Sequence, residues 1–494
     1  MNRKSTIPAG IAGTLIAALS PTGEAGASAP QVTHVEGTAT LLLGNYDVTK
    51  MGYTCDEYFL SGTARSYTTA KPLVADGRWA AEALATAPYR TRIVVMRPAD
   101  PAKFNGTVIV EWLNVSGGLD APADWFMAHR EIMRSGYAYV AVSAQRVGIE
   151  GGVSMGADMS LKKVNPTRYE ALSHPGDAFA FDIFSQAGKV VRNAQATSIL
   201  GPLAAKQVLA VGESQSAHFL TTYVNAIDPI ARVYDGYMIH SRFGGSAPLD
   251  GSSMIGASVS NYPQRVHFRS DIRVPLITII TETDLVGTGR RGFYVARQPD
   301  TNRLRTWEVP GTAHADTYTV QVAPIDTGAA SIEKIAAAYR PAGTLMGMKL
   351  PKPINFAPQH HYIVEAALSA LNTWVSSGEP APAASPMALT QDNPPQLVPD
   401  SEGNATGGVR TPWMDVPTAR LSGTGNTGNG MAMLFGSSEP FDAATLARLY
   451  PGGKGDYLGR FEKSLDMTIS KGFLLPADRS EILALAAAMY PVTP

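Results

Sequence analysis

A serine stands at the centre of the sequence Gly-Glu-Ser-Gln-Ser, which runs from Gly212 to Ser216. The strand-like stretch KQVLAV precedes it and the helix-like stretch AHFLTTYV follows it. A turn this sharp between a strand and a helix needs small residues two positions before and after the serine, and Gly212 and Ser216 meet that need. Ser214 would then project at a helix N-terminus, where free backbone N–H groups stabilise negative charge. The pattern therefore predicts a nucleophilic serine.

A serine nucleophile needs a base, and the base needs an acid that fixes its tautomer. The strand-like VPLITII ends in TETD, and the strand-like stretch ending in TWEVP runs into GTAHAD. We predict Asp284 as the acid and His314 as the base, because both follow strand ends in the order serine, acid, histidine. Glu282 is the alternative acid. Taken singly, Ser214 and Asp284 could be helix caps and His314 an ordinary loop histidine; their joint occurrence favours catalysis.

The loop after TVIVEWL supplies the second half of the predicted site. We expect the oxyanion hole to combine the N–H of Gln215 with that of Val115, with the N–H of Ser116 as the next choice. Four side chains beside these groups are candidates for the pocket wall: Asn114, Ser116, Glu213 and His218. For His218, one turn after the serine, a packing role is the stronger interpretation. Four methionines are interpreted as core residues in preference to an acyl pocket: Met127, Met133, Met155 and Met159.

Short apolar strands alternating with helices position these groups. The expected strands of the main sheet are Arg92–Met96, Thr107–Leu113, Tyr137–Ser143, Lys206–Val211, Asp235–His240, Val274–Ile280 and Arg303–Val309. The expected helices are Asp124–Ser135, with Asp124 as its cap, Ala178–Arg192 and His361–Ser376. This alternation predicts an α/β fold with a mostly parallel central sheet and helices on both faces. Thr38–Leu43 and Glu57–Tyr67 predict an antiparallel N-terminal edge, and the first two strands of the main sheet are expected to be neighbours.

The composition excludes several classes of protein. The 494 residues include 41 Lys and Arg against 42 Asp and Glu, so no basic excess indicates a nucleic-acid partner. No apolar run reaches the ~18 residues of a membrane-spanning helix. The single cysteine, Cys55, excludes an internal disulfide or a cysteine zinc site. His361 and Glu365 lack a third ligand, and we interpret them as a solvent-facing or intrahelical pair. The G-x-G-x-x-G segments at Gly287 and Gly423 do not follow an N-terminal strand, so no cofactor or metal is predicted.

The chain divides into three predicted parts. Residues 1–27 are expected to be a signal peptide, with basic Arg3 and Lys4, a short apolar stretch and a small-residue cleavage pattern ending at Ala27. Export would place the protein in a periplasm or outside the cell. Residues 28–380 form the predicted core. They include lid-like insertions at about 145–176 and 242–273, because loops of this length in a compact domain are usually functional. Residues 381–494 are a C-terminal extension that packs on the core or forms a small subdomain.

The segments GESQS, TETD, GTAHAD and EWLNVSGG resemble the α/β-hydrolase superfamily, and more narrowly a group of secreted bacterial α/β-hydrolase-domain proteins. The resemblance runs from about Val35 to the C-terminus and includes GNATGGVRTPWMDVP and LFGSSEPFD. It implies an α/β-hydrolase fold with Ser214 as nucleophile, Asp284 as acid and His314 as base. Ser216 departs from the superfamily pattern, which has glycine there, and this departure concerns the helix–strand contact.

These observations predict an exported serine hydrolase that cleaves a small-molecule or oligomeric carboxylic ester through an acyl-enzyme on Ser214. An amidase, a peptidase or a lactonase using the same triad is the nearest alternative, because all share the acyl-enzyme. A catalytically silent binding protein on the same fold is the alternative from another class. The acyl and alcohol specificity and the oligomeric state are not predicted.

Overall fold

The computed structural model describes Met1 and residues 29–39, 41–42, 47–255, 263–288, 291–345, 347–426 and 431–491. Apart from Met1, the predicted signal peptide lies outside the described residues. So do parts of the strand predicted at 38–43 and of the lid predicted at 242–273. The described residues between 38 and 42 are not in a strand, and the first strand lies earlier, at Gln31–Val35.

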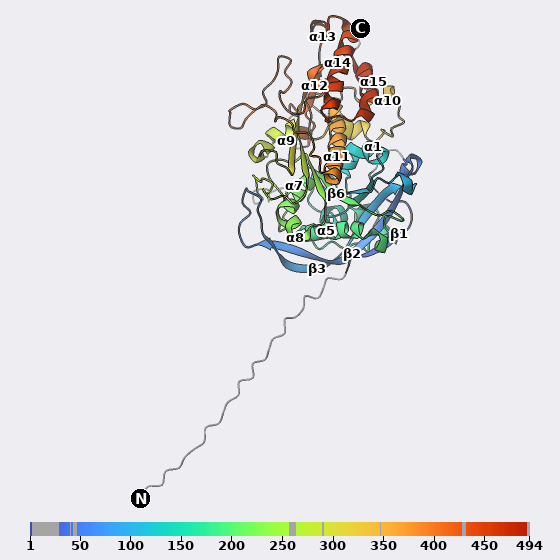
Figure 1. Ribbon diagram of the computed structural model, residues 1–494, viewed down its shortest axis with the longest axis vertical. Coiled ribbons are helices and arrows are strands. Elements are labelled where there is room, and N and C mark those ends of the chain that lie inside the picture. Colours follow the sequence, from blue (N-terminus) through green and yellow to red (C-terminus); the bar gives the residue numbers. More distant parts are fainter. Residues whose placement is uncertain are drawn as a thin grey trace.

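One mixed sheet forms the centre of the molecule (Figure 1). Within the described residues it has nine strands in the order β1-β2-β3-β5-β4-β6-β7-β8-β9. Their bounds are β1 Gln31–Val35, β2 Tyr53–Thr69, β3 Ala81–Pro98, β4 Thr107–Trp112, β5 Ala138–Val142, β6 Gln207–Glu213, β7 Gly236–His240, β8 Leu276–Thr281 and β9 Leu304–Val309. β1, β2, β3 and β5 pair antiparallel, and the remaining pairs are parallel. The predicted fold class, a mostly parallel sheet with an antiparallel N-terminal edge, is confirmed.

The expectation that the first two strands of the main sheet are neighbours is wrong. β5 lies between β3 and β4, so that Val140 pairs with Val95 on one side and with Val110 on the other. The reason is the crossover helix α1 (Ala123–Arg134), which returns the chain parallel to β4 and delivers β5 to its open edge.

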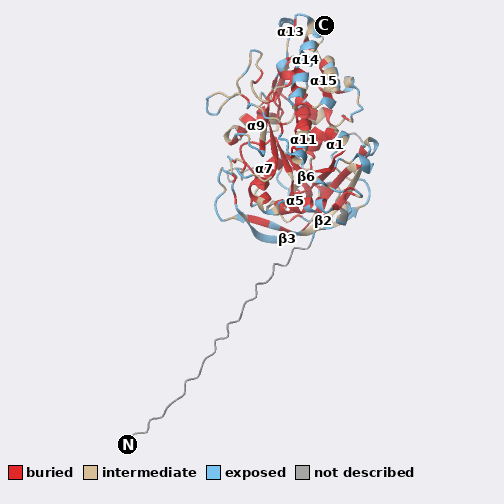
Figure 2. Ribbon diagram, viewed as in Figure 1, coloured by how far each residue is buried: buried red, intermediate tan, exposed pale blue. Residues whose placement is uncertain are grey.

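Helices cover both faces of the sheet. α1 and α11 (Gln359–Ser377) lie on one face, and α5 (Ala180–Arg192) and α7 (Gln215–Thr222) lie on the other. Successive residues of β4 alternate between the two apolar clusters: Ile109 belongs to the first, and Val108 and Val110 belong to the second. Figure 2 shows the resulting concentration of buried residues around the sheet and α11. A strand buried on both faces reads as a continuous apolar run, which is why β4 and β5 could be found from the sequence.

Further elements surround this core. Those that precede the C-terminal extension are α2 Arg146–Glu150, α3 Leu161–Val164, α4 Pro166–Tyr169, α6 Ala194–Thr197, α8 Asp228–Ala231, α9 Glu282–Val286, α10 Ile332–Ala338, β10 Thr344–Leu345 and β11 Met348–Lys349. Those of the extension are α12 Pro412–Asp415, β12 Ala419–Ser422, β13 Ser437–Pro440, α13 Ala443–Leu449, α14 Gly453–Ser470 and α15 Arg479–Met489. α2, α3 and α4 belong to the first predicted insertion.

The extension packs on the core. Trp307 of β9 meets Phe473 with their ring centroids 5.0 Å apart. Arg130 of α1 binds Glu481 of α15 at 2.9 Å. In Figure 1, α13, α14 and α15 gather at the end of the molecule opposite β2 and β3. The extension therefore shares the apolar core that contains α1 and α11.

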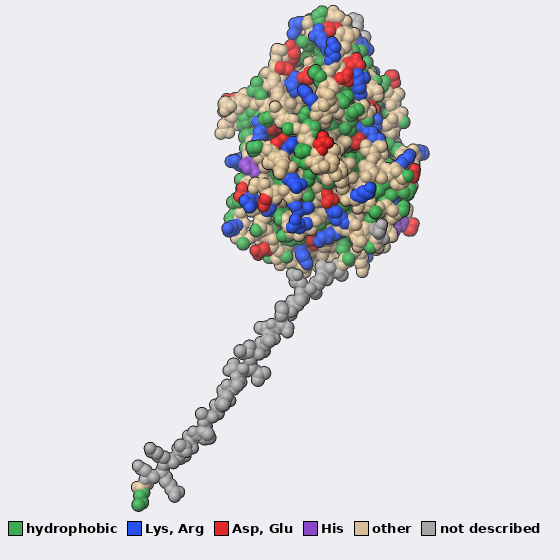
Figure 3. Space-filling model, viewed as in Figure 1, with side chains coloured by type: hydrophobic (Ala, Val, Ile, Leu, Met, Phe, Trp, Pro, Cys, Tyr) green, Lys and Arg blue, Asp and Glu red, His purple; other side chains and the backbone are tan. Residues whose placement is uncertain are grey.

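Charged side chains of both signs are interspersed over the face seen in Figure 3. Among the residues that the structure describes, no helix combines the length and apolar character needed to cross a membrane.

Candidate active site

The Gly-Glu-Ser-Gln-Ser segment forms a sharp turn between β6 and α7. Ser214 lies in it with φ 59° and ψ −114°, a backbone conformation that strains a residue with a side chain. A Cβ added to Gly212 would lie 2.9 Å from Leu220 Cδ1 and 3.0 Å from Ser216 Cβ. The turn therefore leaves little room for a side chain at 212, while Ser216 is accommodated with its side chain buried. This is the geometry of a nucleophile elbow.

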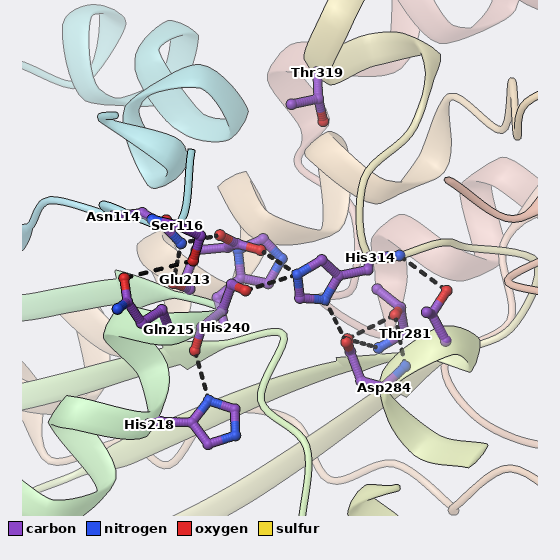
Figure 4. A network of polar contacts seen from close by, with 12 residues as sticks. Asn114, Ser116, Glu213, Gln215, His218, His240, Thr281, Asp284, His314 and Thr319 are labelled. Carbon is purple, nitrogen blue, oxygen red and sulfur yellow. Dashed lines mark hydrogen bonds and ion pairs between the residues drawn. The ribbon is translucent and has the colours of Figure 1, made fainter. Parts of the chain in front are cut away.

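The structure brings the three predicted catalytic side chains together. His314 Nε2 lies 2.8 Å from Ser214 Oγ, and His314 Nδ1 lies 2.6 Å from Asp284 Oδ1. Because a carboxylate oxygen only accepts, Nδ1 carries the hydrogen and Nε2 is left to accept the serine proton. Figure 4 shows the His314 ring between Glu213 and Asp284. The ring of Phe243 stacks on His314, with centroids 5.6 Å apart.

A capping box at the start of α9 decides which acid faces the histidine. Asp284 Oδ2 accepts hydrogen bonds from Thr281 N at 3.0 Å and Thr281 Oγ1 at 2.6 Å, which leaves Oδ1 for His314. Burial alone would raise the pKa of Asp284, but the charge of His314 and the hydrogen bonds from His314 and Thr281 outweigh it and lower that pKa. The sequence signal was available, since Thr-x-x-Asp is a capping-box pattern that places Asp284 at the third helical position.

The alternative acid, Glu282, faces away from the histidine. Its Oε1 accepts from Gly311 N at 2.6 Å, and its Oε2 accepts from Gly423 N at 2.7 Å and Ser422 Oγ at 3.3 Å. Burial raises its pKa to about 7, against the opposing effect of these hydrogen bonds. Glu282 therefore joins the loop of His314 to the C-terminal extension and is excluded as the partner of His314.

The loop after β4 approaches the elbow. Asn114 Nδ2 donates to Glu213 O at 3.1 Å and to Glu213 Oε2 at 3.2 Å, while Asn114 Oδ1 accepts from Ser116 N at 2.8 Å. Val115 N donates to Gln215 Oε1 at 3.2 Å. The N–H of Ser116, the second choice for the oxyanion hole, is thus directed at Asn114. The N–H of Val115, the first choice for the oxyanion hole, is directed at the elbow, where the side chain of Gln215 accepts it.

A cavity of about 120 Å³ opens beside the serine. Parts of the chain far apart in sequence form its wall, which consists of Ser116, Met155, Ser214, Gln215, Phe243, Met254, Ile255, Thr288, His314 and Leu434. Met155 belongs to the first predicted insertion, Met254 to the second and Leu434 to the extension. The interpretation of Met155 as a core residue is therefore wrong, because the insertion folds back over the elbow, where Met155 N donates to Ser116 O at 2.8 Å.

Of the four predicted pocket residues, Ser116 alone belongs to the described wall of this cavity. Asn114 and His218 are buried behind it. His218 Nδ1 lies 2.8 Å from Ser214 O, which ties the ring to the first turn of α7 and gives it the packing role. Glu213 contacts the base directly, with Oε1 3.3 Å from His314 Nε2. Burial raises the pKa of Glu213 to about 8, although the charge of His314 acts in the opposite direction.

A second histidine cluster, which the sequence analysis missed, lies beneath the elbow. His240, the last residue of β7, has Nδ1 2.9 Å from Asp124 Oδ1 and Nε2 2.9 Å from His360 Nε2. His360 Nδ1 lies 3.2 Å from Asp316 Oδ2. All four side chains are buried. Asp124 is therefore not the cap of α1, which begins at Ala123, and burial raises its pKa to about 8. The signal was the position of His240 at a strand end.

Within the described part of the chain, no group of three or more His, Cys, Asp or Glu side chains is arranged to hold a metal ion. His361 and Glu365, interpreted from the sequence as a solvent-facing or intrahelical pair, are both buried. The ring of His361 stacks on Tyr318 with centroids 3.7 Å apart, and Glu365 binds Arg134 at 3.2 Å. α11 is enclosed between the sheet and the extension, and this enclosure excludes a solvent-facing position for the two residues.

The family described as alpha/beta hydrolase domain matches residues 19–484, so the chain belongs to that family. No protein of curated function matches the sequence significantly.

Several solved structures are similar over part of the chain. The esterase Est22 is 13% identical with a TM-score of 0.26, over 47% of this chain and 64% of that one. A serine hydrolase without a lid from Xanthomonas campestris is 14% identical with a TM-score of 0.27, over 46% and 80%. A glucuronoyl esterase from Solibacter usitatus is 11% identical with a TM-score of 0.27, over 56% and 84%. The match thus spans less than two thirds of Est22, and likenesses this distant do not identify a substrate.

Proposed function

We propose that this protein is a serine hydrolase that cleaves carboxylic esters through an acyl-enzyme on Ser214. One observation carries the proposal: Ser214 Oγ, His314 and Asp284 form a continuous hydrogen-bonded chain, with distances of 2.8 and 2.6 Å, at the wall of a cavity. Nucleophile, base and orienting acid in this geometry are what acyl transfer requires. A binding protein has no use for a strained serine aligned with a histidine and a buried carboxylate.

In the first half of the proposed reaction, His314 Nε2 removes the proton from Ser214 Oγ as this oxygen attacks the ester carbonyl. The imidazolium is stabilised by Asp284, which also keeps the hydrogen on Nδ1. The negative charge on the carbonyl oxygen is taken up by the N–H groups of Gln215 and Val115. Collapse of the tetrahedral intermediate returns the proton from His314 to the leaving alcohol.

In the second half, water replaces the alcohol. His314 Nε2 removes a proton from the water as it attacks the acyl carbonyl, and the same two N–H groups again take up the charge. The proton then returns to Ser214 Oγ and the carboxylic acid leaves. Each turnover consumes one ester and one water and leaves the protein unchanged.

The test compares the protein from Ser28 onward with its Ser214→Ala variant on p-nitrophenyl esters of graded acyl length. We expect turnover in the parent and its loss in the variant. Equal turnover in both would refute the assignment of Ser214. If neither turns over, a fluorophosphonate probe separates the remaining cases: labelling at Ser214 means a narrow substrate range, and no labelling favours the binding protein. Turnover of matched p-nitroanilide and lactone substrates, measured beside that of the esters, distinguishes an esterase from an amidase, a peptidase or a lactonase.

We also propose that the protein is exported, on the strength of the basic and then apolar segment before Ala27. Intact-mass analysis of the protein recovered from its bacterial host, after separation of cytoplasm, periplasm and medium, tests this. An exported chain that begins at Ser28 is expected, whereas a full-length chain confined to the cytoplasm would contradict it.

A further inference from the structure

The side chain of Gln215 lies across the oxyanion hole proposed above. Its Oε1 accepts the N–H of Val115 at 3.2 Å and lies 3.5 Å from Ser116 Oγ, within reach of that hydroxyl. Figure 4 shows Gln215 reaching from the elbow toward the loop of Asn114 and Ser116. Gln215 and Ser116 both belong to the wall of the cavity beside Ser214.

The donors of the loop fix which atom of the amide group faces them. The N–H of Val115 can only donate, so the amide oxygen and not the amide nitrogen must lie toward it. The N–H of Ser116 is directed at Asn114 Oδ1, 2.8 Å away, which leaves the hydroxyl of Ser116 as the group of this residue that faces Gln215. The Gln215 carbonyl oxygen thus accepts from Val115 N, one of the two N–H donors proposed for the oxyanion hole, and lies within reach of the Ser116 hydroxyl.

We infer that the Gln215 side-chain oxygen is a resting occupant of the oxyanion hole, which the substrate carbonyl displaces, and that the Ser116 hydroxyl is a third donor to the oxyanion. The inference rests on the proposed ester hydrolysis. The backbone N–H of Gln215 is unaffected by movement of its own side chain, because it is fixed as the first residue of α7. Gln215 would thus supply both a permanent donor, its backbone N–H, and a displaceable occupant, its side-chain oxygen.

The relative strengths of the hydrogen bonds favour replacement of the Gln215 oxygen by the charged oxygen of the substrate. A hydrogen bond to a charged oxygen is roughly twice as strong as one between neutral groups. The amide oxygen of Gln215 therefore accepts from Val115 N and the Ser116 hydroxyl in the resting protein. The substrate oxygen replaces it as negative charge develops there. The resting occupant also keeps these donors paired beside the apolar side chains of Met155, Phe243 and Met254, which offer water few partners.

The opposite interpretation is that Gln215 is a brace that holds the Val115 loop in its working position. The two interpretations predict opposite signs for Gln215→Met, which keeps the length of the side chain and removes the acceptor. If the oxygen is a displaceable occupant, kcat/KM for p-nitrophenyl acetate rises about fivefold, because no hydrogen bond has to be broken first. If the side chain is a brace, kcat/KM falls. Gln391→Met, at an exposed position of the extension, is the matched control for the substitution itself.

The second arm concerns Ser116. Loss of one oxyanion donor costs roughly 10²-fold in kcat where the donor is well aligned, and we expect at least tenfold for Ser116→Ala with KM within about twofold. Ser377→Ala, which removes an exposed hydroxyl that binds Thr373 O, is its control. Equal kcat values for Ser116→Ala and for the parent would overturn the role of the hydroxyl.

A structure of the parent protein after reaction with diethyl p-nitrophenyl phosphate decides the matter without any substitution. In that adduct the phosphoryl oxygen is expected within hydrogen-bond distance of Val115 N, with Gln215 Oε1 moved away. If Gln215 Oε1 still accepts from Val115 N and the phosphoryl oxygen lies elsewhere, the inference is wrong. Failure of the reagent to modify Ser214 at all would instead refute the proposed function, so the two failures are distinguishable.

Discussion

Two of the histidine–aspartate pairs in this molecule, His314–Asp284 and His360–Asp316, lie close together, and they differ in what the second nitrogen of each histidine meets. The Nδ1 of His314 faces Asp284, and its Nε2 faces the hydroxyl of Ser214 at the wall of the cavity. The Nδ1 of His360 faces Asp316, but its Nε2 faces the ring of His240. The two pairs have the same residue types, and both are buried.

The difference teaches that a buried His–Asp contact does not by itself indicate catalysis. Two imidazole nitrogens 2.9 Å apart share one hydrogen, so His240 and His360 satisfy each other. Burial and the neighbouring His360 hold the pKa of His240 well below its usual range, so this ring is neutral. The inner cluster therefore has a structural role, joining β7, α1 and α11 beneath the elbow.

The largest expected effect on activity distinguishes His314 from His360. We expect His314→Asn to lower kcat for p-nitrophenyl acetate by roughly 10⁴-fold, because the base is lost. His360→Asn should lower it less than about tenfold while reducing the free energy of unfolding, because a buried partner of His240 and Asp316 is lost. Steady-state kinetics and urea denaturation on both variants test this. Comparable losses of kcat would show that the inner cluster takes part in the chemistry.

The second-largest expected effect on activity distinguishes Asp284 from Glu282, the two acids of the TETD segment. Asp284→Asn should lower kcat by roughly 10³- to 10⁴-fold, because an amide can hold the histidine in the wrong tautomer. Glu282→Gln should leave kcat within about tenfold but destabilise the protein by about 2 kcal/mol, because an NH₂ group then faces N–H donors. Kinetics together with chemical denaturation measure both. A catalytic loss for Glu282→Gln as large as that for Asp284→Asn would contradict the assignment.

A smaller effect concerns Glu213, the carboxyl that touches His314. Burial raises its folded pKa from 4.5 to about 8, so the folded state binds its proton more tightly than the unfolded state does. Its contribution to stability is therefore present below about pH 4.5 and is lost as the pH rises through 8. In Glu213→Gln the loss of unfolding free energy between pH 5 and 9 should be smaller by at least about 1 kcal/mol. Identical pH profiles for parent and variant would mean that Glu213 titrates normally.

The smallest effect is expected at the elbow position that departs from the superfamily pattern. Ser216→Gly should change kcat/KM by less than about twofold and stability by less than about 1 kcal/mol, because the elbow already accommodates the serine. Ser216→Leu is the contrasting variant and should lower both quantities, since the side chain of Ser216 is fully buried. Equal kcat/KM and equal stability for the two variants would show that packing at the elbow does not limit the size of the side chain at position 216.

Much of this site could be predicted from the sequence because its parts are local. The Gly-x-Ser-x-Ser turn and the Thr-x-x-Asp capping box each follow a strand that is buried on both faces and therefore reads as an apolar run, and the histidine loop follows the edge strand β9. Parallel strands bring their carboxyl ends to one edge, so the order of the segments was enough to bring Ser214, Asp284 and His314 together.

Sequence alone determined most of the elements, the mixed sheet, the elbow and the three segments that meet there, because periodicity and turn chemistry act over a few residues. Only the tertiary structure decided which carboxylate faces His314, that Gln215 lies across the loop of Val115, and that Met155, Met254 and Leu434 close one cavity. Side-chain direction and contacts between distant segments depend on packing in three dimensions, where a rotation about a single bond exchanges one partner for another.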